Sequence, residues 1–146
     1  MYDITKYQGI IPAFYACYDD SGAISPERVR ALTRYFLDKG VKGLYVGGSS
    51  GECIYQSVAE RRTVLENVME AAEGRLTIIA HVACNNTADS MELAAHAESL
   101  GVDAVAAIPP ICSRRRPSQS TGTTSPPPPP TRISSSTISP SWRALR

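Results

Sequence analysis

The sequence lacks the motifs that mark several common protein classes. None of its four cysteines belongs to a C-x-x-C pair, which argues against a zinc site and a dense disulfide framework and fits a reducing compartment. No apolar run approaches the length that spans a bilayer, and no basic region precedes a long apolar stretch at the N-terminus. We therefore expect a cytoplasmic protein with no metal site and no membrane partner.

Acidic residues and lysines are both missing from residues 112–146. This segment carries 6 Arg, whereas residues 1–111 carry 9 Lys and Arg against 14 Asp and Glu. Ser, Thr, Pro and Arg dominate the segment, and this composition buries too little apolar area to offset chain entropy. We expect a folded domain over residues 1–111, followed by a disordered low-complexity tail. Trp142 is the one aromatic residue among its arginines, and no nucleic-acid partner is therefore expected.

Residues 1–111 alternate short apolar strands with amphipathic helices. Strands are expected at residues 9–16, 43–48, 76–82 and 103–109. The first helix begins at Ser25-Pro26 and ends at Gly40, and Asn86 or Thr87 caps the third. The second helix is expected to turn Leu65 and its apolar neighbours inward and to leave Arg61 and Arg62 outside. Strands without polar alternation, separated by helices, predict a parallel α/β sheet covered by helices.

The spacing of the strand–helix units suggests a barrel. A Gly-Val pair leads into a strand at Gly40 and again at Gly101, 61 positions later, which is two units of about 30 residues each. This is the pitch of a (β/α)₈ TIM barrel, although a doubly wound sheet gives a similar local pattern. Only four strands and three helices are present, which amounts to the N-terminal half of such a barrel.

The stretch "YVGGSSGE" carries the strongest signal of a ligand-binding site in the sequence. It follows a strand, and in α/β proteins ligands bind at the carboxyl ends of the strands. Gly48 and Gly51 allow a tight turn, while Ser49 and Ser50 add hydroxyls beside backbone N–H groups, which suits a carboxylate or phosphate. An ordinary strand–helix turn is the plain alternative. A G-x-S-x-G nucleophile elbow is disfavoured because no histidine follows in a suitable place, and dinucleotide and Walker A motifs are absent.

The quoted motifs together resemble a known enzyme family. "GIIPAFYACYDDSGAIS", "GLYVGGSSGE", "SVAERRTVLE" and "IIAHVACNNTADSMELAAHAESLGVDAVAAIPP" cover residues 8–111 almost continuously. They are similar to the dihydrodipicolinate synthase / N-acetylneuraminate lyase family, and "VGGSSGE" and "AHV" resemble its lyase branch. The resemblance implies a class I aldolase-type carbon–carbon lyase that forms a Schiff base between a lysine and pyruvate, needs no cofactor, and is usually a homotetrameric TIM barrel.

The resemblance also assigns roles to individual residues. Ser49 and Ser50, with Gly48 and Gly51, would hold the pyruvate carboxylate, and Ser49 would join a proton relay. Ser50 stands where the lyase branch commonly has threonine. For His81 we favour a satisfied core histidine over one that lines the barrel mouth.

The family's catalytic tyrosine and Schiff-base lysine would lie beyond Ile111. Lys6, Lys39 and Lys42 are the lysines of the sequence, and none occupies a suitable strand. Read in another frame, residues 121–146 can spell "YWNDISAAAPNTDFIIYNIPQLAGVA", which contains the family's "YNIP" motif. We therefore expect an inactive, truncated fragment ended by a frameshift near Cys112, where many members have a tyrosine. Its unpaired sheet edges predict aggregation or a molten state.

The intact enzyme would cleave N-acetylneuraminate, or a related 2-keto acid, to pyruvate and a sugar or other aldehyde. One alternative is a dihydrodipicolinate synthase-type aldol condensation. A second is a genuine basic tail that binds RNA, acidic surfaces or SH3-like domains. A third is a non-catalytic half-barrel interaction module that pairs with a full subunit through its open edge.

Overall fold

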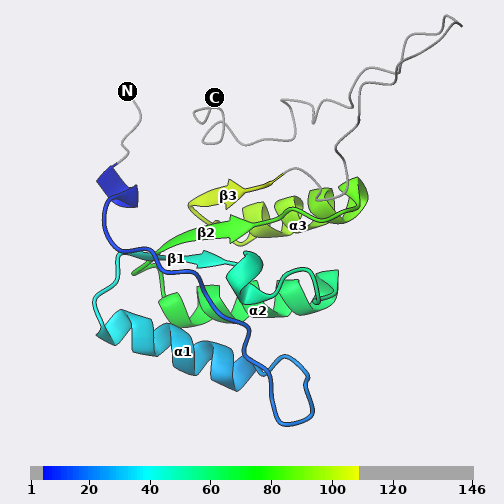
Figure 1. Ribbon diagram of the computed structural model, residues 1–146. Helices are drawn as coiled ribbons and strands as arrows, with labels where there is room; N and C mark the ends of the chain where they lie inside the picture. Colours follow the sequence, from blue (N-terminus) through cyan, green and yellow to red (C-terminus); the bar gives the residue numbers. More distant parts are fainter. Residues whose placement is uncertain (1–4, 109–146) are drawn as a thin grey trace, which may run out of the picture. The chain divides into compact units, whose positions relative to one another are not determined.

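The computed structural model describes residues 5–108, in which helices alternate with parallel strands (Figure 1). The helices are α1 (Pro26–Asp38), α2 (Val58–Ala72) and α3 (Thr87–Ser99). The strands are β1 (Gly43–Val46), β2 (Thr77–His81) and β3 (Ala104–Ala106). Two short 3-10 turns complete the order, η1 (Thr5–Tyr7) before α1 and η2 (Ser49–Gly51) between β1 and α2. The predicted tail, including Cys112, lies outside the described residues.

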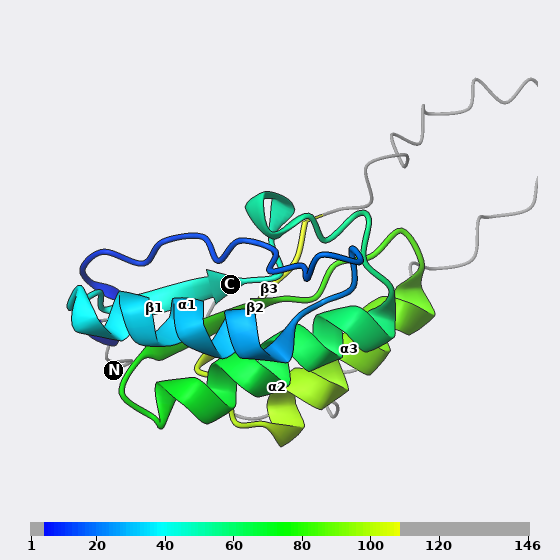
Figure 2. The same ribbon diagram turned by 90° about the horizontal axis from the view of Figure 1, so that it is seen from below.

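The strands form one parallel sheet in the order β1-β2-β3, so each new strand is added on the same side of the last. Crossovers between parallel strands are right-handed, and strands added in one direction therefore place their helices on one face. Figure 2 shows α1, α2 and α3 side by side along the sheet, with α1 packed on α2 and α2 on α3. A doubly wound sheet reverses its strand order and covers both faces. This part of the chain follows the barrel pattern instead.

The first expected strand, residues 9–16, does not form a regular strand. It runs beside β1 and makes one isolated parallel bridge, between Ala13 and Tyr45. Tyr45 N donates to Pro12 O at 2.9 Å, and Phe14 N donates to Tyr45 O at 2.8 Å. Pro12 has no N–H to continue the ladder toward Gly43, so regular pairing is limited to this short stretch. The segment still covers the free edge of β1.

Alternate strand residues separate the face of the sheet that the helices cover from a second face, called the uncovered face because no helix of residues 5–108 packs on it. Leu44, Val46, Ile78 and Ala80 are all at most 3% exposed and pack against the helices. The residues between them point to the opposite face, which would be the interior of a complete barrel. On that face Tyr45 lies beside Ile79 in the sheet register, and both are only half-buried.

The helix ends follow the sequence signals. Ser25 caps α1 by accepting from Arg28 N, and Asn86, rather than Thr87, caps α3 by accepting from Ala88 N at 2.8 Å. A reciprocal capping box between Ser57 and Glu60 begins α2. These contacts satisfy N–H groups that a helix leaves free at its start. Helix directions are thereby fixed, and each helix ends near the amino edge of the sheet.

The N-terminal turn η1 closes the amino edge of the sheet. Lys6 Nζ lies 3.1 Å from Asp103 Oδ1, and Tyr7 Oη donates to Asp103 O at 2.9 Å. Thr77 Oγ1 donates to Lys6 O at 3.0 Å, and Asp103 Oδ2 accepts from Ile78 N at 2.9 Å. The Asp103 carboxylate raises the pKa of Lys6 because it favours the charged ammonium group. Among residues 5–108, no helix is long and apolar enough to cross a membrane.

Candidate functional site

The glycine–serine loop, Gly47–Glu52, leaves the carboxyl end of β1 and turns sharply (Figure 1). Gly47 has a φ of +73°, a left-handed conformation that glycine adopts without steric cost. Gly51 N donates to Gly48 O at 3.0 Å, which closes the turn η2. Glu52 then adopts φ 57°, and its N–H donates to Ser49 O at 3.0 Å. The backbone is therefore held by its own hydrogen bonds.

Two glycines of the loop are required by close contacts. A Cβ at Gly48 would lie 2.6 Å from the ring of Tyr45, which projects from the uncovered face of β1. A Cβ at Gly51 would lie 2.8 Å from the carbonyl oxygen of Phe14. Both glycines are buried, so the loop is seated directly on the sheet. Neither glycine has a positive φ, so glycine is needed at these positions for close contact with Tyr45 and Phe14 rather than for the turn itself.

Ser49 and Ser50 lie on the exposed side of the same loop. Within residues 5–108, no hydrogen bond of the structure engages either hydroxyl group. Both hydroxyls and the backbone N–H of Ser50 can therefore donate to a ligand at the carboxyl edge of the sheet. Clustered N–H and O–H donors on a fixed turn suit an oxyanion such as a carboxylate.

His81, the last residue of β2, lies beneath the loop on the uncovered face of the sheet. It is 7% exposed, and its Nδ1 lies 2.9 Å from Gly47 O. Because a carbonyl oxygen can only accept, Nδ1 carries the proton. Burial lowers the pKa of His81; the Gly47 hydrogen bond opposes that shift, while the positive charge of Arg61 lowers the pKa further. His81 is thus neutral at pH 7, and its ring lies 6.1 Å from that of Tyr45.

Arg61 was expected outside and is instead 5% exposed. Its Nη2 donates to His81 O at 2.6 Å and to Gly47 O at 3.4 Å. Its Nη1 donates to Ala83 O and to Cys84 Sγ, both at 3.0 Å. The side chain turns toward the sheet because free carbonyl groups gather where β1 and β2 end. The outward prediction was wrong.

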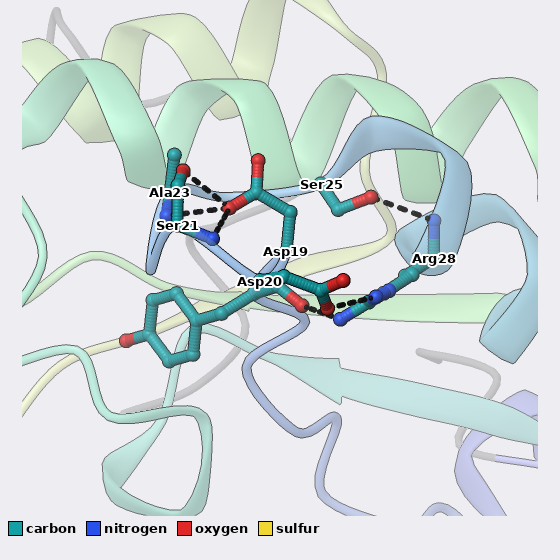
Figure 3. Close-up of polar contacts among 7 residues, drawn as sticks. Asp19, Asp20, Ser21, Ala23, Ser25 and Arg28 are labelled. Carbon is teal, nitrogen blue, oxygen red and sulfur yellow. Dashed lines mark hydrogen bonds and ion pairs between the residues drawn. The ribbon is translucent and has the colours of Figure 1, made fainter.

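A second loop, residues 18–25, directly precedes α1 (Figure 3). Asp19 Oδ1 accepts from Ser21 N at 2.8 Å, from Ser21 Oγ at 2.6 Å and from Ala23 N at 3.1 Å. These hydrogen bonds, the Ser21 hydroxyl first, lower the pKa of Asp19. Arg28 adds an ion pair with Asp20 at 2.6 Å. The loop is thus ordered by its own polar groups.

Gln56 joins this loop to the glycine–serine loop. Its Nε2 donates to Gly51 O at 3.0 Å and lies 3.5 Å from Tyr18 Oη. The amide of Gln56 therefore supports the loop at Gly51, whereas Arg61 contacts it at Gly47. Neither residue was identified from the sequence. For Arg61 the signal was present, because residues 61, 65, 68 and 72 share one helix face.

A small cavity lies behind the loop, on the covered side of the sheet. It holds about one water molecule, too little for a keto acid. Its lining includes Val46, Gly47, Arg61, Leu65, Ala80, His81, Val82 and Leu93. The exposed side of the glycine–serine loop, rather than this cavity, is therefore the candidate ligand surface.

The lysines lie far from this surface. Lys6 pairs with Asp103 just before β3, Lys39 caps the C-terminus of α1, and Lys42 directly precedes β1. All three positions are at the amino edge of the sheet, whereas the glycine–serine loop is at the carboxyl edge. No lysine of the sequence reaches the loop. Cys17, Cys53 and Cys84 are free thiols.

Comparisons with a family model and with curated proteins find relatives of this chain. The Dihydrodipicolinate synthetase family matches residues 6–120. N-acetylneuraminate lyase of Mediterraneibacter gnavus is 73% identical over 111 residues, covering 76% of this chain and 35% of the relative. N-acetylneuraminate lyase of Escherichia coli K12 is 43% identical over 106 residues, 73% of this chain and 36% of the relative.

Solved structures give the same result. Wild-type sialic acid aldolase of Ruminococcus gnavus superposes with a TM-score of 0.72 at 75% identity, covering 73% of this chain and 35% of that one. Dihydrodipicolinate synthase of Aquifex aeolicus superposes with a TM-score of 0.64 at 29% identity, covering 68% and 34%. The chain thus spans about a third of the length of the relatives it matches. From its strand order, its loop and these matches, the chain belongs to the Dihydrodipicolinate synthetase family.

Proposed function

We propose that this chain carries the carboxylate-orienting part of a Schiff-base-forming lyase that cleaves N-acetylneuraminate, or a related 2-keto acid, to pyruvate and a sugar. The observation that supports this most is the pair of exposed hydroxyls of Ser49 and Ser50, unengaged within residues 5–108, on a loop that its own hydrogen bonds hold at the carboxyl edge of the sheet. Two relatives named N-acetylneuraminate lyase, at 73% and 43% identity, favour this branch over the synthase, whose solved relative is 29% identical.

The loop would bind the carboxylate of the keto acid. Ser50 would donate from its hydroxyl and its N–H, and the Ser49 hydroxyl would donate to the carboxylate and pass a proton during the reaction. Hydrogen bonds to an ionised acceptor are short and strong, and they would fix the orientation of the C2 carbonyl. Such orientation brings the reacting carbonyl to a nucleophile without performing the chemistry itself.

Bond cleavage requires a lysine that the described residues do not place at the loop. In class I aldolase chemistry the amine condenses with the C2 carbonyl, water leaves, and the imine takes up the electrons of the breaking carbon–carbon bond. Lys6, Lys39 and Lys42 lie at the opposite edge of the sheet. We propose that the chain as it stands has no lyase turnover, and that residues 112–146 are translated out of frame. Cytoplasmic location and homotetrameric assembly of the intact enzyme belong to the same proposal.

Borohydride trapping tests the proposal. The chain and a frame-restored version are each treated with pyruvate and borohydride, and modified residues are identified by mass spectrometry. We expect no adduct on the three lysines of the chain and an adduct on one downstream lysine of the restored version. An adduct on the chain itself would contradict the account of the lysines. No adduct on the restored version would contradict the proposed function.

The carboxylate-binding role of Ser50 is tested in the restored version by Ser50→Ala. Loss of the hydroxyl should raise the KM for pyruvate in the condensation direction by about tenfold, the effect of one hydrogen bond to a charged group. Ser21→Ala, in the neighbouring loop, is the matched control. An unchanged KM for Ser50→Ala would remove this serine from the binding site.

A further inference from the structure

Arg61 occupies a position that is unfavourable for a cation. It is 5% exposed and stands in the first turns of α2, where the helix dipole disfavours positive charge. No carboxylate within residues 5–108 lies at ion-pair distance from it. Its Nε is buried without a hydrogen-bond partner. Burying a charge that has no ion-pair partner is costly, so other interactions of Arg61 must offset this cost.

The guanidinium group joins the ends of two strands. Through Nη2 it bonds both Gly47 O, where the chain leaves β1, and His81 O, where β2 ends. Through Nη1 it reaches Ala83 O, two residues farther along. His81 adds a second link, because its ring N–H also points to Gly47 O. Gly47 is therefore held from two sides at the residue whose φ of +73° turns the loop.

We propose that Arg61 is a positioning residue that fixes the glycine–serine loop in its anion-binding conformation by tying Gly47 to the carboxyl end of β2. The role of the loop as an anion site rests on the proposed function, whereas the hydrogen bonds by which Arg61 joins Gly47 to the end of β2 do not. Arg61 acts through the backbone and contacts no substrate. Its planar fork can meet several carbonyl groups at once, which a lysine ammonium cannot match.

A purely structural role is the alternative, in which Arg61 only fills space between α2 and the sheet. The two roles predict different patterns of amide protection. A space-filling residue affects α2 and the sheet generally, whereas a positioning residue affects residues 47–52 selectively. A positioning role also predicts that the missing guanidinium can be supplied from solution.

Hydrogen exchange with mass spectrometry on the complete chain separates these roles. In Arg61→Ala, peptides covering residues 47–52 should exchange about tenfold faster, because the charge-assisted hydrogen bond to Gly47 O is lost together with the neighbouring bonds to His81 O and Ala83 O. Peptides from α1 should be unchanged. Ethylguanidinium, at concentrations far below the denaturing range, should restore protection of the loop. Arg62→Ala, which removes an exposed arginine paired with Glu92, is the matched control and should show neither effect.

Arg61→Lys keeps the charge without the fork and should recover only part of the protection. Equal loss of protection in α1 and the loop, or no response to ethylguanidinium, would overturn the proposal. An unprotected loop in the unaltered chain would also overturn it.

Pyruvate is added in a separate arm of the same experiment. If Arg61 protects the loop but pyruvate gives no further protection to the unaltered chain, the positioning role of Arg61 is supported and the proposed function fails. If pyruvate protects the unaltered chain and Arg61→Ala equally, the inference about Arg61 fails and the proposed function stands.

Discussion

Replacement of Gly51 by alanine should displace the glycine–serine loop from the sheet. The added Cβ would lie 2.8 Å from the carbonyl oxygen of Phe14, whereas ordinary contact begins at 3.4 Å. The two groups must therefore separate by at least 0.6 Å (3.4 − 2.8). Phe14 cannot yield easily, because its own N–H is bonded to Tyr45 O at 2.8 Å. The loop has to move instead.

The cost of this movement follows from overpacking. Forcing one methyl group into a packed contact raises the free energy of the folded state by about 1–3 kcal/mol. The Gln56 bond to Gly51 O, at 3.0 Å, is strained or lost in the same movement. We therefore expect Gly51→Ala to lower the free energy of unfolding by about 1–3 kcal/mol.

Urea unfolding followed by far-UV circular dichroism measures this change, at one fixed protein concentration because association shifts the midpoint. Ser50→Ala is the control: its side chain is exposed and makes no described contact, so its stability should remain within about 0.5 kcal/mol of the unaltered chain. If Gly51→Ala is as stable as Ser50→Ala, the loop is not seated on Phe14 and the steric argument is refuted.

Three further predictions concern the cap of α2, the amino edge and the open sheet. Hydrogen bonds from Ser57 lower the pKa of Glu60, so the contribution of Glu60 to stability is present above the ordinary carboxyl pKa and is lost as pH falls through the lower folded value. Ser57→Ala should therefore reduce the fall of the melting temperature at acid pH, measured in a pH series. Asp103→Ala removes the bonds to Lys6 and Ile78 N and should lower the free energy of unfolding by about 1–3 kcal/mol, measured by urea unfolding, and an unchanged value would contradict the closure of this edge. The uncovered sheet face should make the chain self-associate, and a monomer at all concentrations in light scattering after size exclusion would count against this.

The elements that depend on local signals were predictable. Ser25-Pro26 and Asn86 cap their helices as the sequence indicates, and α1, α2 and α3 are all confirmed. The expected strand at residues 9–16 failed at Pro12, whose missing N–H interrupts the ladder. That outcome was readable from the sequence, since proline seldom continues a strand.

The glycine–serine loop could be predicted from the sequence, but the residues that hold it in place could not. The "GGSS" turn follows from glycine and serine chemistry at the end of a strand. Arg61 turns inward because of carbonyl groups at His81 and Ala83, some 20 residues away, and no local pattern reveals where those carbonyls lie. Helical spacing alone places Arg61 on the face of Leu65 and Val68. The prediction that it faces solvent was based on its charge and was wrong.

The closure of the amino edge also sets an order of folding. Lys6 and Tyr7 contact Asp103 across 97 and 96 positions of sequence, and Lys6 contacts Thr77 across 71. Contacts between residues so distant in sequence form late, because the loop between them must first be organised. The neighbouring strand–helix units can pair as they emerge, whereas η1 has only its bond with Thr77 until Asp103, just before β3, is in place. Residues 5–7, which are synthesised before the strands they contact, are therefore among the last to reach their final position.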